Sequence, residues 1–310
     1  MLRFLAWRLL QFPLMLAVIY VITFLLAWVA PGTPFDNEGD RTLDPRALQA
    51  IKQRMHAESP LQFLAYYPYH LLTTGDFGPS LKYEEWSVND IMGAALPISL
   101  TIGLAGLSVA IIGGVGLGTL AAVRRGSLLD WLSLTVAIIG ISIPGFVTAA
   151  LLLVLFAVKW PIFPIGGWGS FSALILPALA VGLMPMAYIA RLTRVSMLEV
   201  LSSDYIRTAR AKGLSRWQVV THHGLRNALL PVLSYIGPAA AGTLTGSFVV
   251  EQVFNLPGLG QHFVNSVRNR DQTLILGTVM VYAVLLLSMN LLVDIAYAWV
   301  DPRIEVEKRG

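Results

Sequence analysis

Six long stretches of this chain contain no aspartate, glutamate, lysine or arginine. They cover residues 9–35, 91–123, 131–158, 160–190, 227–250 and 272–293. A helix needs about 20 residues to cross the hydrocarbon core of a bilayer, and each stretch is long enough. Backbone groups in lipid must be satisfied within helices. The pattern therefore predicts an all-α membrane protein with six transmembrane helices, and the low charged fraction, 13% of the residues, agrees.

A seventh uncharged run, 252–267, is too short to span and contains Pro257, Gly258 and Gly260. It is interpreted as a loop or re-entrant piece.

The chain has no cysteine, which excludes structural disulfides and cysteine-based metal sites. Arg3 and Arg8 precede an apolar run longer than the roughly 7–15 residues of a signal-peptide core, so we expect a retained first span.

The charges predict which way the spans sit. With the N-terminus in the cytoplasm, the inside segments would be 1–8, 124–130, 191–226 and 294–310. They hold 14 Lys/Arg and 7 Asp/Glu, whereas the outside segments hold 8 and 11. The net charge is then +7 inside and −3 outside, in line with the positive-inside rule. Both termini are expected in the cytoplasm.

The expected organisation has four parts. Residues 1–30 form the N-terminal segment and first span, and residues 31–90 form an extracytoplasmic collar. Residues 91–300 form a five-helix core that includes short cytoplasmic helices at 202–226, and residues 301–310 form a tail. Within the collar, 43–55 is predicted to be helical and 73–80 to be a turn, because "TTGDFGPS" is rich in turn residues.

Small residues predict how two of the spans pack. Span two carries Gly106, Ala110, Gly114, Gly118 and Ala122, one small residue at every fourth position, which favours a close helix contact. Span five has small residues and a kink that suit either close packing or a pore-lining helix, and both interpretations stay open. Its candidate positions on the translocation path are Gly237, Pro238, Gly242 and Gly246.

Prolines within spans three and four, at 144, 177 and 185, predict kinks.

The sequence offers no recognisable catalytic constellation. It lacks the G-x-x-x-x-G-K-[ST] phosphate loop, so no ATP site of that kind is expected. His222 and His223 are adjacent, so a helix would point them in different directions, and we expect no metal pair. Asp294 lies at the edge of the last span, where an interfacial partner for a cytoplasmic arginine is favoured over a site in the membrane.

A basic block interrupts the apolar pattern between spans four and five. Residues 202–231 contain four Arg, one Lys, two His and one acidic residue. Asp204 as N-cap and Gly213 as C-terminal stop predict a helix over 205–212. Ser215 and Gln218 fit a capping box for a second helix. So short a helix is marginal alone and needs a surface. Either anionic lipid or the groove of a cytoplasmic protein would serve, and the defined caps and small residues favour the protein.

The segment "DYIRTARAKGLSRWQVVTHHGLRNALLPVLSYIGP" (204–238) resembles the cytoplasmic signature of dipeptide/oligopeptide-type permease subunits of ABC importers. The segments "APGTPF" (30–35), "GDFGPSLKY" (75–83), "FNLPGLGQHFVN" (254–265), "NRD" (269–271) and "DPR" (301–303) resemble further motifs of the B-type subunits of oligopeptide importers. Arg207-Thr208 stands where the broader importer pattern has Glu-Ala. The resemblance covers nearly the whole chain.

The resemblance implies a type I ABC importer permease fold in the bacterial inner membrane, importing di- or oligopeptides. It implies a second, similar membrane subunit, two cytoplasmic ATPase subunits that bind ATP and Mg, and an extracytoplasmic peptide-binding protein; contact with membrane lipid is expected and nucleic acid is not. The ATPase-coupling residues carried over are Asp204, Tyr205, Arg207, Thr208, Ala209, Arg210, Ala211, Lys212, Gly213 and Leu214. The outer gate or binding-protein contact would involve Asp76, Phe77, Gly78, Pro257, Gly258 and Gly260.

Three alternatives remain. The same type of permease could import another small solute, such as glutathione or a nickel complex. A secondary transporter would be expected to carry ionisable groups near the membrane midplane or inverted repeats, and neither is clear here. An intramembrane enzyme would need a nucleophile–base or metal constellation. ATPase subunits that co-purify in stoichiometric amounts would count against the last two.

Overall fold

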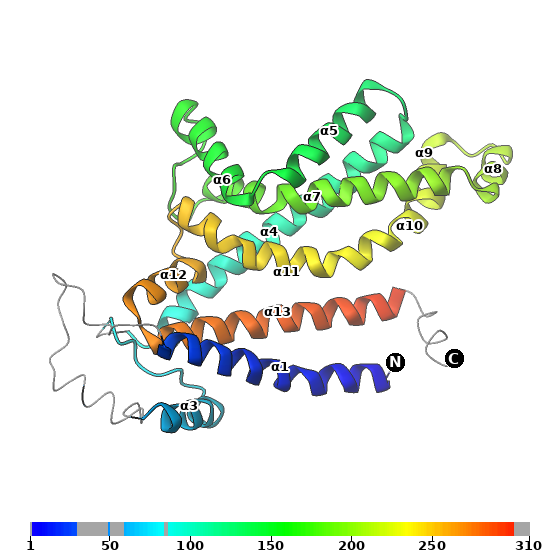
Figure 1. The fold of residues 1–310 in the computed structure, drawn as a ribbon. Helices are drawn as coiled ribbons and strands as arrows, with labels where there is room; N and C mark the ends of the chain where they lie inside the picture. Colours follow the sequence, from blue (N-terminus) through cyan, green and yellow to red (C-terminus); the bar gives the residue numbers. More distant parts are fainter. Residues whose placement is uncertain (1, 30–48, 50–58, 84–85, 301–310) are drawn as a thin grey trace. The chain divides into compact units, whose positions relative to one another are not determined.

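The computed structural model describes residues 2–29, 49, 59–83 and 86–300. Its regular secondary structure is helical in these residues, apart from an isolated bridge between Pro79 and Ser87 (Figure 1). The helix predicted over 43–55, the tail 301–310 and the side chain of Asp294 lie outside what is described. By internal contacts the chain divides into two units, Met1–Ser99 with Leu256–Ser288, and Leu100–Asn255 with Met289–Gly310.

The elements follow one another in this order: α1 Leu2–Val29, α3 Pro60–Thr74, α4 Val88–Val123, α5 Leu128–Ser142, α6 Gly145–Leu153, η1 Val154–Lys159, α7 Phe171–Leu201, α8 Asp204–Ala211, α9 Arg216–Gln218, η2 Val219–Gly224, α10 Leu225–Ala228, α11 Leu230–Val253, α12 Leu259–Asn269 and α13 Gln272–Val300. The two η elements are π-helical turns. Two of the three boundaries between the units fall inside α4 and α13, and the third lies between α11 and α12.

Five of the described helices are long and apolar enough to cross a membrane: α1, α4, α7, α11 and α13. A bent pair, Leu128–Ser142 with Gly145–Lys159, would make six if counted as one span. The two halves meet at an angle of 108°, far more than the proline kink predicted at Pro144 (Figure 1). The break is sharp because Ile143 adopts an extended backbone and Pro144 starts a new helix. The count of six spans stays a prediction.

The apolar run 160–190 is helical only from Phe171, so it begins as a loop and α7 continues instead to Leu201. The segment 252–267 was predicted to be a loop or re-entrant piece. It contains most of the short helix α12, which is not among the described helices that are long and apolar enough to cross a membrane. Pro177 and Pro185 lie inside α7, as expected, and the helix runs through them.

The small-residue ridge of α4 packs closely against α7, as predicted. A Cβ atom added to Gly114 would lie 2.7 Å from Ile189, and one added to Gly118 would lie 2.4 Å from the carbonyl oxygen of Ala190. The ridge members Ala110 and Ala122 are buried. Close approach of two backbones raises the packing contribution of a membrane helix pair, so this contact is a main support of the second unit.

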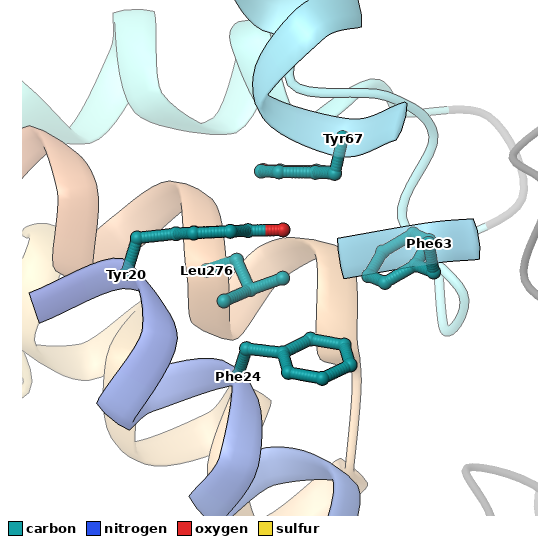
Figure 2. Packing of buried hydrophobic residues seen from close by; sticks show 5 residues of the cluster. All are labelled: Tyr20, Phe24, Phe63, Tyr67 and Leu276. Atoms are coloured by element: carbon teal, nitrogen blue, oxygen red, sulfur yellow. The ribbon is translucent and has the colours of Figure 1, made fainter. Parts of the chain in front are cut away.

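The first unit holds an aromatic cluster that the sequence did not reveal. Tyr20 and Phe24 of α1 pack with Phe63 and Tyr67 of α3 and with Leu276 of α13 (Figure 2). All five side chains are at most 6% exposed. Aromatic pairs whose ring centroids lie about 4.5–7 Å apart contribute stability beyond that gained from burying their surface. The cluster therefore fixes α3, the described helix of the collar, to the first and last long helices.

Candidate functional site

The basic block forms two short helices joined by a glycine stop. Ser203, and not Asp204, occupies the N-cap position, and α8 begins at Asp204. The side chain of Ser203 donates to the carbonyl oxygen of Val200, 2.6 Å away, so it makes no cap bond to α8. The prediction of Asp204 as N-cap was therefore wrong by one residue. Both are good capping residues, and only the turn at the end of α7 selects between them.

The end of α8 is as predicted. Gly213 has a φ of +81°, a left-handed conformation that favours glycine. The amide of Gly213 donates to the carbonyl of Arg210 at 3.0 Å, and that of Leu214 donates to the carbonyl of Ala209 at 3.4 Å. These two bonds are those of a Schellman motif. Ser215 and Gln218 then form the predicted capping box at the start of α9.

The block turns an apolar face toward its own chain. Ile206, Ala209 and Val219 form a buried cluster, with Val200 and Leu201 of α7 packed against it. Ile206 is fully buried and Ala209 is 7% exposed. A helix of eight residues is marginal in isolation, so this internal packing is what holds α8 in place. Ala209, one of the residues assigned to ATPase coupling, contacts the interior and is not available to a partner.

The opposite face of the block is open to solvent. It carries the remaining residues assigned to coupling, all exposed: Asp204, Tyr205, Arg207, Thr208, Arg210, Ala211, Lys212, Gly213 and Leu214. Arg207 lies 3.3 Å from Asp204, but the side chains are 75% and 95% exposed, so this ion pair contributes little to stability. The outward face thus carries a small side chain at Ala211 and a net positive charge.

Two polar contacts tie α8 to a later part of the block, and a third fastens the block to α4. The side-chain amide of Asn227 donates to the Tyr205 hydroxyl at 2.9 Å, and that hydroxyl lies 3.5 Å from the carbonyl oxygen of His223. The guanidinium of Arg216 donates to the carbonyl oxygen of Val123, the last residue of α4. These contacts were not predictable, because each joins positions that are 18 to 93 residues apart.

The candidate translocation residues lie on two sides of α11. Pro238 and Gly242 are exposed, and they share a face with Ser234 and Thr245 at helical spacing. Nothing lies within 4 Å of a Cβ added to Gly242. Gly237, in contrast, is buried, and Gly246 lies in the helix without a described environment. The exposed face of α11 is therefore formed by residues 234, 238, 242 and 245.

An aromatic pair extends this surface. The rings of Tyr188 on α7 and Tyr235 on α11 are 4.2 Å apart between centroids, and Tyr188 is 40% exposed. The pair adds hydroxyl groups beside those of Ser234 and Thr245, which are exposed on α11. The sequence pattern offered no reason to choose either tyrosine, because both fall inside apolar stretches.

The candidate outer-gate residues are held in a polar loop of the first unit. The amide of Phe77 donates to Asn89, and the amide of Gly78, at a φ of +90°, donates to Asp76, both at 2.8 Å. Near the start of α12, the amide of Leu259 donates to the Ser99 hydroxyl at 2.8 Å. Gly258 and Gly260 are buried, whereas Pro257 is exposed. Among the candidate outer-gate residues of these two segments, Pro257 is the most accessible.

A buried carboxylate organises the same loop. Asp271, fully buried before α13, accepts from the Ser80 hydroxyl and from the amide of Leu81 at 3.0 Å through one oxygen. Its other oxygen accepts from Thr273 at 2.9 Å and from the amide of Leu274 at 3.1 Å, which caps the helix. Hydroxyl and amide donors thus satisfy both oxygens of this buried side chain. The "NRD" motif contained this residue, but its partners were not predictable.

Comparison with known proteins gives the site its context. Residues 114–306 match a family described as the inner membrane component of binding-protein-dependent transport systems. The chain belongs to this family. It is 44% identical over 293 residues, 94% of each chain, to the dipeptide transport system permease protein DppB of Bacillus subtilis (strain 168). It is 42% identical over 306 residues, 98% of this chain and 99% of the relative, to the oligopeptide transport system permease protein OppB of Escherichia coli (strain K12).

The fold of this transport-system component is also found in a solved structure. A chain from the inward-facing MetNI methionine ABC transporter aligns with a TM-score of 0.53, covering 68% of this chain and 96% of that one. At 18% identity the likeness concerns the fold alone. The all-α, multi-span permease fold predicted from the sequence is confirmed, as is the resemblance to the dipeptide and oligopeptide permeases.

Proposed function

We propose that this chain is one membrane subunit of an ATP-driven importer that carries di- or oligopeptides across the bacterial inner membrane. The observation that carries the proposal is near full-length identity of over 40% to two peptide permeases. Import of another small solute, such as glutathione or a nickel complex, is the alternative outcome of the transport test. A second membrane subunit, two ATPase subunits and an extracytoplasmic peptide-binding protein complete the proposed assembly. Hydrolysis of ATP takes place in the ATPase subunits.

The proposed contact with an ATPase subunit is the outward face of α8 and its glycine stop. Its inward face is occupied by Ile206 and Ala209, so any partner meets Arg207, Thr208, Ala211 and Lys212. Closure of the ATPases would displace α8, and the spans would then alternate between outward-open and inward-open arrangements. Peptides would pass along the face of α11 that exposes Ser234, Pro238, Gly242 and Thr245. An uncharged surface suits this role, because a transported molecule must be bound weakly enough to be released.

The collar and the segment around Pro257 are proposed to meet the binding protein and to shape the outer gate. The loop from Asp76 to Gly78 supports this role, because the amides of Phe77 and Gly78 are hydrogen-bonded and pre-organised docking surfaces change little on binding.

The test of the proposed function uses the complete complex in vesicles. ATP-dependent uptake of a labelled tripeptide is measured together with ATPase activity and co-purification of the ATPase subunits. Ala211→Trp places a bulky ring on the exposed face of α8 and should abolish uptake, whereas Ala211→Ser keeps the side chain small and should transport normally. The proposal for α8 fails if Ala211→Trp transports as well as the parent. The peptide assignment fails if the parent complex, with its binding protein, moves glutathione or a nickel complex but not the labelled tripeptide.

A further inference from the structure

Helix α3 has a composition unlike that of a loop exposed to water. Its 15 residues, PLQFLAYYPYHLLTT, contain no aspartate, glutamate, lysine or arginine. At 1.5 Å per residue the helix is about 22 Å long, shorter than the roughly 30 Å hydrocarbon core of a bilayer. It cannot span a membrane, and nothing in the proposed transport function requires so apolar a helix in the collar.

One face of α3 is fixed to α1. The rings of Tyr67 and Tyr20 are stacked with centroids 6.0 Å apart, and the Phe63 ring lies 6.1 Å from that of Phe24 (Figure 2). The hydroxyl of Tyr20 donates to the backbone carbonyl of Leu64 at 3.1 Å. These contacts set the position of α3 along α1, because they involve particular turns of both helices.

The position of α3 along α1 corresponds to membrane depth. The candidate span of α1 is Trp7–Val29. Tyr20 and Phe24, the α1 side chains that pack against α3, both lie inside this candidate span. The part of α3 that contacts them therefore lies beside a membrane-spanning segment of α1.

The opposite face of α3 is apolar and uncovered. Leu61 is 76% exposed, Tyr69 is 66% exposed and Leu72 is 86% exposed. Together with the exposed Ala65 they share one side of the helix, at the spacing i, i+4, i+8 and i+11. Exposed side chains in the outer part of the α1 span are also large and apolar: Ile22, Leu25, Leu26 and Val29. Both helices of the pair thus expose apolar side chains.

The C-terminal turn of α3 satisfies its own polar groups. The hydroxyl of Thr73 donates to the carbonyl of Tyr69 at 2.8 Å, and that of Thr74 donates to the carbonyl of His70 at 2.7 Å. Gly75, at a φ of +68°, closes the helix by donating to the carbonyl of Leu71 at 2.9 Å. Such internal satisfaction is required of backbone in contact with lipid and is unnecessary in water.

We infer that α3 is an interfacial membrane helix whose stripe of Leu61, Ala65, Tyr69 and Leu72 lies against the lipid chains, beside the outer half of α1. Lipid is favoured over a protein partner because α3 packs on side chains inside the candidate span of α1, and because exposed side chains of that span are apolar as well. In addition, α3 contains no aspartate, glutamate, lysine or arginine. Tyrosine suits this place, because its ring is apolar and its hydroxyl reaches the wet boundary. The helix would brace the first span from the side.

Spin labelling tests the inference directly. The chain has no cysteine, so a single introduced cysteine is unique in it once the partner subunits are made cysteine-free. Labels are placed at Leu61 and Leu72 in the complete complex, in vesicles of phosphatidylethanolamine and phosphatidylglycerol. Collision with oxygen, which concentrates in lipid, is compared with collision with a water-soluble nickel chelate. We expect oxygen accessibility to exceed nickel accessibility several-fold at both positions.

Two controls define the scale. A label at Gln62, exposed at the polar edge of the stripe, should collide with the nickel chelate more often than its neighbour at Leu61. A label at Arg125, exposed in the loop after α4, reports full contact with water. Nickel accessibility at Leu61 and Leu72 as high as at Arg125 would overturn the inference, because the stripe would then face water. Protection from both reagents only in the assembled complex would also overturn it, since a protein would then cover the stripe.

Discussion

Arg194 donates to both carboxylate oxygens of Asp130, with its Nε 2.6 Å from one oxygen and its Nη2 3.0 Å from the other. The pair joins α7 to the first turn of α5, and its side chains are only 18% and 7% exposed. The amide of Gly126 also donates to Asp130, at 2.9 Å. A bidentate arginine pair is directional as well as strong, so it fixes the start of α5 against α7.

Removing Arg194 should leave the Asp130 carboxylate buried without its main partner. We expect Arg194→Ala to lower the free energy of unfolding by about 2 kcal/mol, between the values for surface pairs and for deeply buried pairs. The melting temperature of the purified complex measures this. Asp204→Asn breaks the exposed pair with Arg207 and serves as control, with no measurable change expected. Equal melting temperatures for Arg194→Ala and the parent would show that the pair does not hold α5.

Two glycines of α4 provide a matched test of close packing. A methyl group at Gly114 would lie within 2.8 Å of Ile189 and of the Met186 carbonyl, whereas one at Gly116 would meet nothing within 4 Å. Gly114→Ala should therefore lower the melting temperature by several degrees, because α4 and α7 must separate. Gly116→Ala should leave it unchanged. If both variants melted alike, the ridge would not be a helix–helix contact.

Protonation of His262 should weaken the fold at acid pH. Burial lowers the pKa of this α12 imidazole below its ordinary value of 6.5. The unfolded chain then takes up the proton at a higher pH than the folded chain does. The contribution to stability is present above pH 6.5 and is lost as the pH falls from there toward the lowered pKa. In His262→Gln, the drop in melting temperature between pH 7.5 and pH 5.5 should be smaller than in the parent. An identical drop would contradict the prediction, and His222→Gln, at an exposed position, is the matched control.

The orientation proposed from the charge pattern predicts opposite labelling of two exposed sites. A cysteine replacing Lys212 should react with a membrane-impermeant maleimide only in inside-out vesicles, and one replacing Pro257 only in intact spheroplasts. The two sites flank α11, so their separation also checks that this helix crosses the membrane. The reverse pattern would place the basic block outside and would remove it as an ATPase contact.

Features that depend on near neighbours in the chain were predictable. The stop at Gly213 follows from the conformational freedom of glycine, and the capping box of Ser215 and Gln218 follows from their spacing. The ridge on α4 followed from a repeat of four residues within one helix. In each case the residues that decide the structure lie within a few turns of one another, so their order in the chain carries the information.

Features that depend on distant partners were not predictable. The 108° bend at Pro144 was expected only as a kink, because the proline itself does not specify how far the second half turns. The burial of Ala209 required knowledge of where Val219 and the end of α7 lie. Helix α3 was not predicted for a different reason: its uncharged run is too short to span a membrane, and it lacks the charged face of a helix exposed to water.

The separation of the two faces of α8 has a consequence for how such proteins diverge. Ile206 and Ala209 pack against the interior of the same chain, whereas Arg207, Thr208 and Ala211 are exposed, on the face proposed to meet an ATPase subunit. Substitutions on the outward face are therefore free to follow changes in a partner subunit without disturbing the membrane helices. Relatives that exchange one ATPase for another are expected to differ at 207, 208 and 211 and to keep small or aliphatic residues at 206 and 209.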